Sequence, residues 1–139
     1  LLVGACVLTV SFFFTSLPFT NPLAAVGMIL LSSFLFAQFG IIAAIYSNTF
    51  DNLSMYTNFL ILPLIYTGGL FYPVSHLPPV WQKISHLNPI TYLIDGFRQS
   101  IVGVASTPLW LDFAVAGTIA LVLFAWAWGI VKTGHRLRN

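Results

Sequence analysis

The residues of this sequence that could do chemistry are few and lie in its second part. The first fifty residues contain no Asp, Glu, Lys, Arg or His, and the whole chain has three acidic residues, five Lys or Arg residues and three histidines. His76, His86 and Asp95 suggest a metal site, but their spacings of ten and nine residues match no set of ligands on one helix. We therefore expect His76 and His86 to be surface or interfacial residues, and we predict no metal site.

Known catalytic patterns are missing from the sequence. It contains neither the G-x-S-x-G of serine hydrolases nor the H-E-x-x-H of zinc proteases, and no P-loop pattern G-x-x-x-x-G-K-[ST]. Cys6 is the single cysteine, so no disulfide can form within the chain. We predict that the protein is not an enzyme, that it holds no cofactor, and that any ATP hydrolysis occurs on another polypeptide.

Asp95 and Arg98 are the most suggestive charged pair. They stand three residues apart, a spacing that places both side chains on one face of a helix. An ion pair on the helix surface is the favoured interpretation, and a clamp for a charged substrate is the alternative.

Composition restricts the class of protein that must position these residues. Hydrophobic residues make up 58% of the chain and charged residues 6%, and the mean hydropathy is +0.93. A soluble domain has about a quarter charged residues. The net charge of +2 is too small for a nucleic-acid-binding surface. We predict an all-α integral membrane protein.

Four apolar segments predict membrane-spanning helices, at about residues 1–17, 22–46, 53–72 and 111–131. Asn21 with Pro22 is a good start signal for the second helix, and Thr107 with Pro108 for the fourth. Asp51 is the candidate N-cap of the third helix.

The third segment is the least regular. Pro63 and the Gly68-Gly69 pair interrupt it, either as a packing kink or as a working hinge, and the two readings weigh equally. Ser54, Thr57 and Asn58 share a stripe of this helix, and we expect that polar edge to face protein or a water-filled path.

Residues 73–110, which we name the cap segment, contain no further full span. Two short helices are expected, at about 79–87 and 89–102, because Pro78-Pro79 and Asn88-Pro89 are helix-start signals. In the second helix, two charges oppose insertion by about 2.5 to 3.5 kcal/mol each, which outweighs about 3 kcal/mol from six strongly apolar residues. We therefore predict an amphipathic or re-entrant helix, with its polar face, including Thr91 and Asp95, opposite the apolar one.

Charge distribution predicts the orientation. The tail, residues 132–139, carries three fixed positive charges and no acid, whereas residues 73–112 are balanced. By the positive-inside rule the C-terminus is cytoplasmic, and the cap segment lies on the extracytoplasmic side.

The stretch GLFYPVSHLPP at residues 69–79, followed by LNPITYLIDGFR at residues 87–98, resembles the C-terminal signature of ABC-2 permeases. These are membrane subunits of bacterial drug and polysaccharide exporters in the inner membrane. The similarity extends from about residue 24 to the basic tail and is most specific over residues 63–98. Members have six spans with both termini cytoplasmic, and this chain corresponds to the last four. The first two spans and the main ATPase-coupling loop are missing, so this piece alone is not expected to transport.

The resemblance implies a homodimeric permease with a separate ATPase subunit, which would hold the ATP and Mg²⁺. It implies export of a drug-like, lipidic or glycan substrate, with the two short helices as an external gate. The residues at this gate and its signature would be Gly68, Gly69, Phe71, Tyr72, Pro73, Leu77, Pro78, Asn88, Pro89, Tyr92, Asp95 and Arg98. The third helix would line the path, with Ser54, Thr57 and Asn58 as candidates.

Two other functions stay open, an ion-coupled carrier and a non-transporting membrane scaffold. Proton-driven carriers usually keep an ionisable residue near the middle of the membrane. Here the charged residues fall in loops, helix ends or the cap segment, which favours an ATP-driven pump, although Na⁺ coupling through backbone carbonyls is compatible with the sequence.

Overall fold

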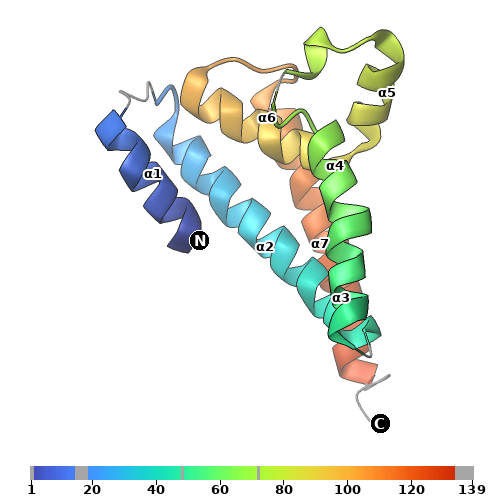
Figure 1. Ribbon diagram of the computed structural model, residues 1–139. Helices are drawn as coiled ribbons and strands as arrows, with labels where there is room; N and C mark the ends of the chain where they lie inside the picture. Colours follow the sequence, from blue (N-terminus) through green and yellow to red (C-terminus); the bar gives the residue numbers. More distant parts are fainter. Residues whose placement is uncertain (1, 15–18, 48, 72, 134–139) are drawn as a thin grey trace.

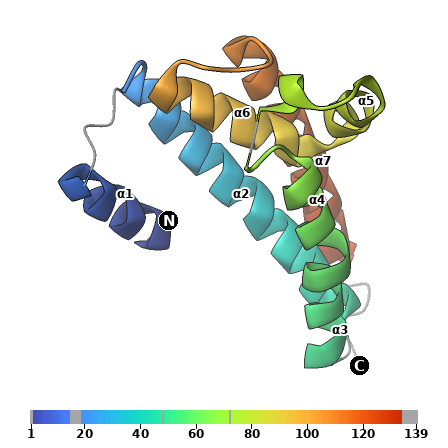
Figure 2. The same ribbon diagram turned by 45° about the horizontal axis from the view of Figure 1, so that its top comes forward.

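The computed structural model describes residues 2–14, 19–47, 49–71 and 73–133, and this part of the chain is helical with no strand. Two long helices, α2 and α7, run side by side, and α6 lies across one end of them (Figures 1 and 2). In chain order the elements are α1 Leu2–Phe14, α2 Pro22–Tyr46, α3 Phe50–Tyr56, a π-helical turn Thr57–Ile61, α4 Leu62–Thr67, a 3₁₀ turn Val74–His76, α5 Pro79–Leu87, α6 Pro89–Val102 and α7 Leu109–Thr133.

Helix α2 begins and ends where the sequence predicts. The Asn21 side chain accepts a hydrogen bond from the Ala24 N–H at 3.2 Å, and Pro22 occupies the first turn. The cap satisfies an N–H that has no partner within the helix. The expected start signal is therefore confirmed in detail.

Two described helices are long and apolar enough to cross a membrane, α2 and residues 109–132 of α7. Helix α7 begins directly after Thr107-Pro108, slightly before the predicted residue 111. Helix α1 is apolar but has only 13 described residues, so the predicted spans at 1–17 and 53–72 stay predictions.

The third segment differs from the single helix that we expected over residues 53–72. It begins at Phe50, where Thr49, and not Asp51, caps it by accepting from the Asn52 N–H at 3.3 Å. A π-helical turn then separates α3 from α4 just before Pro63. Proline lacks an N–H and its ring crowds the carbonyl four residues earlier, and a wider turn relieves that crowding.

Helix α4 ends earlier than predicted, at the two glycines. A Cβ on Gly68 would lie 2.9 Å from the Leu64 carbonyl oxygen and 3.2 Å from the Ile94 side chain. Gly69 has a φ of 81°, in the left-handed region that glycine adopts without strain. The pair therefore turns the chain away from the helix axis at a place where larger residues do not fit.

The helices of the cap segment have the predicted bounds, with α5 at Pro79–Leu87 and α6 at Pro89–Val102. The polar face of α6 is buried. Thr91 and Asp95 are each only 1% exposed, because that face is covered by other parts of the chain and does not point to water.

Close packing holds α6 against both long helices. A Cβ on Gly96 would lie 3.0 Å from the Asp112 Cβ and would overlap the Met28 side chain, so the three helices meet at this glycine. The apolar core continues below it through Leu35 of α2, Leu93 of α6, and Ala116 and Ala120 of α7.

Candidate functional site

The C-terminal end of α4 is attached to the cap segment by side-chain hydrogen bonds to its last carbonyls. Asn88 Nδ2 donates to the Leu64 carbonyl oxygen at 2.5 Å and to Thr67 Oγ1 at 3.1 Å. Ser85 Oγ donates to the Thr67 carbonyl oxygen at 2.8 Å. The last carbonyls of a helix need partners from outside its own ladder. Here α5 and the start of α6 supply them.

Asn88 is also the N-cap of α6. Its Oδ1 accepts from the Ile90 N–H at 3.0 Å and so caps α6, while Thr91 Oγ1 donates to the Ser85 carbonyl oxygen at 2.7 Å. Asn88, Ser85 and Thr91 are all buried. The joint between α5 and α6 and the end of α4 thus form one hydrogen-bonded unit.

Arg98 connects the glycine turn to α6. Its Nη2 donates to the Gly69 carbonyl oxygen, and its Nη1 lies 3.4 Å from Asp95 Oδ1. The ion pair predicted from the sequence is confirmed, but it is not on the surface. The Asp95 side chain is 2% exposed and that of Arg98 is 19% exposed.

The second oxygen of Asp95 holds the loop that leads into α7. Asp95 Oδ2 accepts from the Ser106 N–H at 2.7 Å, from the Thr107 N–H at 3.0 Å and lies 3.0 Å from Thr107 Oγ1. The same Thr107 hydroxyl lies 2.6 Å from Oδ1 of Asp112, in the first turn of α7. Asp112 is fully buried.

The whole arrangement links the end of α4, both cap helices and the start of α7. It contains no exposed nucleophile or general base, and in the described residues no three His, Cys, Asp or Glu side chains come together as metal ligands. His76 and His86 are both exposed, as expected of surface residues. What the arrangement can do is fix, or release, the position of α5 and α6 relative to the long helices.

Comparison with known proteins identifies the family. The family model described as ABC-2 type transporter matches residues 1–102. The chain belongs to the ABC-2 type transporter family. The resemblance found in the signature stretch is thereby confirmed, and the chain is part of a membrane protein.

Individual relatives agree with this assignment. The chain is 34% identical over all its 139 residues to "Inner membrane transport permease YadH" of Escherichia coli strain K12, and equally to the protein of that name from Shigella flexneri. The aligned part is 54% of those proteins, so the chain spans about half the length of the curated relatives it matches. No solved structure is significantly similar to the chain.

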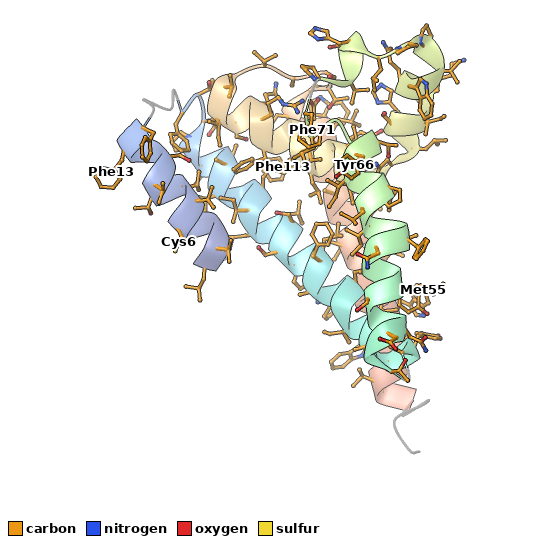
Figure 3. All side chains as sticks on the ribbon, viewed as in Figure 1. Cys6, Phe13, Met55, Tyr66, Phe71 and Phe113 are labelled. Carbon is orange, nitrogen blue, oxygen red and sulfur yellow. The ribbon has the colours of Figure 1, made fainter. Side chains whose placement is uncertain are left out.

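The remaining predicted gate residues of this ABC-2 chain lie around the same unit. Phe71 is exposed and its ring stacks on Tyr66, with centroids 5.8 Å apart, at the C-terminal end of α4 (Figure 3). Tyr92 donates its hydroxyl to the His86 carbonyl oxygen at 2.8 Å. Pro73, Leu77, Pro78 and Pro89 flank the short helices, and Tyr72 lies outside the described residues.

The structure does not bring the three path candidates into this unit. Ser54 in α3 and Asn58 in the π-helical turn are exposed, and the side chain of Thr57 is outside the described part. A cavity of about 520 Å³ lies elsewhere, between α2, α4 and α6. Its lining includes Ser32, Ser33, Ile65, Leu93, Ile94 and Phe97, and none of the three candidates.

Sequence reasoning missed Ser85, Thr107 and Asp112 as members of the unit. Thr107 was read only as part of a start signal for α7. Asp112 carried a usable signal, because an ionisable residue at the start of an otherwise apolar span is expected to find a specific partner. Ser85 carried none, since a serine in a short helix is common and only its neighbours distinguish it.

Proposed function

We propose that this chain is part of the permease subunit of an ATP-driven exporter, in which α5 and α6 form a gate on the extracytoplasmic side. It would supply the last four spans of a six-span permease. Helices α2 and α7 are two of these spans, and α1 and the α3–α4 segment would be the other two. The membrane location and the transport family are established above. Export, the gate and the topology are the proposal.

One observation carries the gate assignment. The last carbonyls of α4 accept hydrogen bonds from Ser85 and Asn88, so α5 and α6 move with the end of α4 or must break these bonds. The π-helical turn and Pro63 lie one turn below, and such irregular turns often mark places where a helix bends. Bending of α3–α4 would therefore reposition both short helices.

The partners in this proposal are a second copy of the permease and a separate ATPase subunit. Permeases of this family typically work with such an ATPase. The sequence has no P-loop of its own, so ATP and Mg²⁺ would be held by the partner, as the resemblance implies. The basic tail supports a cytoplasmic C-terminus and an extracytoplasmic cap segment.

The cavity between α2, α4 and α6 favours an apolar or amphipathic substrate. Apart from the two serines of α2, Ser32 and Ser33, its named lining is aliphatic or aromatic. Drug-like, lipidic and lipid-linked glycan cargo all satisfy this description. A small hydrated ion does not fit this cavity, because the lining offers few polar groups to replace the ion's hydration shell.

A reversible cross-link tests the gate. In the full-length permease with Cys6→Ser, the pair Thr67→Cys and Ser85→Cys would join α4 to α5 at the place where Ser85 Oγ now lies 2.8 Å from the Thr67 carbonyl oxygen. With the ATPase encoded beside the permease gene in proteoliposomes, oxidation should abolish ATP-dependent transport of a cationic dye, a fluorescent phospholipid and a lipid-linked oligosaccharide. Reduction should restore it.

The matched control is a pair within the cap segment itself. Gln82 Nε2 donates to the Ser75 carbonyl oxygen at 3.2 Å, so Ser75→Cys with Gln82→Cys forms a cross-link that does not join α5 to α4. This pair should transport equally in both redox states. If the Thr67–Ser85 link also leaves transport unchanged, the gate assignment fails. If transport follows an ion gradient without ATP, the ion-coupled carrier replaces the exporter.

Orientation is tested by labelling. A cysteine at Ser75 should react with a membrane-impermeant maleimide added to intact cells, whereas a cysteine at Thr133 should react only after the cells are opened. The opposite pattern would overturn the topology.

A further inference from the structure

Two short oxygen–oxygen contacts join Asp95, Thr107 and Asp112, and the single hydroxyl hydrogen of Thr107 can fill only one of them. Thr107 Oγ1 lies 3.0 Å from Asp95 Oδ2 and 2.6 Å from Asp112 Oδ1, both within hydrogen-bond distance. A threonine hydroxyl has one hydrogen, and an ionised carboxylate has none. If both aspartates were ionised, one of the two short contacts would bring two oxygens together with no hydrogen between them.

The surroundings decide which carboxyl is ionised. Asp95 receives two backbone N–H groups and faces Arg98, all of which favour its negative charge. Asp112 is fully buried, its Oδ1 lies 2.6 Å from Thr107 Oγ1, and its Oδ2 has no partner among the described residues. Burying a charge without such compensation is costly.

No other charge reaches Asp112 from the elements packed around it. Helix α6 contributes Asp95 and Arg98, and the Arg98 guanidinium is already shared between Asp95 and the Gly69 carbonyl oxygen. Helix α2 packs here through Met28, and residues 22–45 contain no ionisable side chain. The loop at residues 103–108 contains none, and the nearest charge along α7 is Lys132, at its far end.

We propose that Asp112 is a proton-binding site, whose protonated carboxyl donates to Thr107 Oγ1. Thr107 in turn donates its own hydrogen to Asp95 Oδ2. The three residues then form one directed chain of hydrogen bonds from α7 to α6, in which Asp95 carries the only negative charge and Arg98 balances it. This inference goes beyond the proposed export function and does not depend on it.

The position of the site gives the proton a structural consequence. It lies where α6, the loop at 103–108 and α7 meet, and all three must stay together to keep Asp112 away from water. Separating α6 from α7 would expose the carboxyl and release the proton. The joint of the cap segment is thus sensitive to protons, although the sequence suggested no proton site in the spans.

The test uses the full-length permease in its complex, purified in detergent, with Asp112→Asn as the central variant. Asparagine has the shape of a neutral aspartic acid and can donate to Thr107 Oγ1 in the same direction. Asp51→Asn is the matched control, because Asp51 is exposed and outside the site.

The first readout is the pH dependence of the thermal midpoint. An unfolded aspartate has a pKa of about 3.9, so a folded state that keeps the proton binds more protons than the unfolded chain above that pH, and stability falls as pH rises. Between about pH 4 and 6 the wild-type midpoint should fall relative to Asp112→Asn by about 2–4 °C per pH unit. The Asp51→Asn control should keep the wild-type slope.

The second readout is the infrared carbonyl band of a protonated carboxyl at about pH 5. Subtracting the spectrum of Asp112→Asn from that of the wild type should reveal the band, and subtracting Asp51→Asn should not. Thr107→Ser should keep the band unshifted, whereas Thr107→Val should shift it, because the acceptor is lost. Parallel pH slopes for the wild type and Asp112→Asn, or a band that disappears with Asp95→Asn but persists in Asp112→Asn, would overturn the assignment.

Discussion

Two regions of this molecule are built differently. At the end where α6 crosses the long helices, buried polar side chains and a glycine hold four segments together. Away from it, α1 stands apart from the other helices and α3 offers most of its surface (Figures 1 and 2). Phe13 on α1 is 85% exposed and Met55 on α3 is 61% exposed, and both side chains point outward (Figure 3).

The difference distinguishes the region whose position this chain stabilises by itself from the apolar helix surfaces that lipid or another protein segment must cover. Apolar helix surfaces can face lipid at little cost, because lipid is as apolar as they are. Buried amides, hydroxyls and carboxyls cannot, since an unmet hydrogen bond is expensive in that environment. The cap segment is therefore positioned by this chain, whereas α1 and α3 are free to be covered by lipid, a second copy or other spans.

Asn88→Ala should give the largest effect of three substitutions that probe this contrast. It removes the cap of α6 and leaves the carbonyl end of α4 without its amide donor, for a loss of about 3 kcal/mol of unfolding free energy. Asn21→Ala is the matched control, because Asn21 only caps its own helix, and its loss should be about 1 kcal/mol. Unfolding of the full-length permease in mixed micelles measures both, and equal losses would contradict the contrast.

Gly96→Ala should rank second, at about 2 kcal/mol. The new methyl group would meet the Asp112 Cβ at 3.0 Å and displace the buried Met28 side chain, and overpacking of this kind is destabilising. Gly117→Ala in α7 is the control, because nothing lies within 4 Å of its added Cβ. That change should be neutral or slightly stabilising in the same unfolding assay. A tolerated Gly96→Ala would show that α6 is not closely held.

Ser85→Ala should have the smallest effect of the three, about 1 kcal/mol, because it removes one hydrogen bond between α5 and α4. Ser32→Ala is the comparison, since the Ser32 hydroxyl bonds only to carbonyls of its own helix, Met28 at 2.6 Å and Ile29 at 3.1 Å. Its loss should lie within about 0.5 kcal/mol of zero. Thermal midpoints of the two variants, compared side by side, give the ranking.

Much of the fold could be predicted because its signals are local. The bounds of α2, α5 and α6 follow from Asn or Pro at their starts and from apolar runs, and Asn21 and Asn88 both cap as their positions suggest. The third segment was predicted less well. Pro63 predicted an irregularity in the helix. Whether the helix kinks, ends or widens into a π-helical turn depends on spatial neighbours that the local sequence does not describe.

The sequence by itself determined that this is a helical membrane protein of the ABC-2 family and where most of its helices begin, and it favoured a pair between Asp95 and Arg98. Composition, helix-start residues and the three-residue spacing of Asp95 and Arg98 depend only on nearby positions in the chain, so the sequence alone reveals them. Only the tertiary structure decided that the polar face of α6 turns inward and that Asp112, 17 residues further along, shares a hydroxyl with Asp95. The direction of an amphipathic face depends on what covers it. In this chain Thr107 and the first turn of α7 cover it, and the fold alone brings them there.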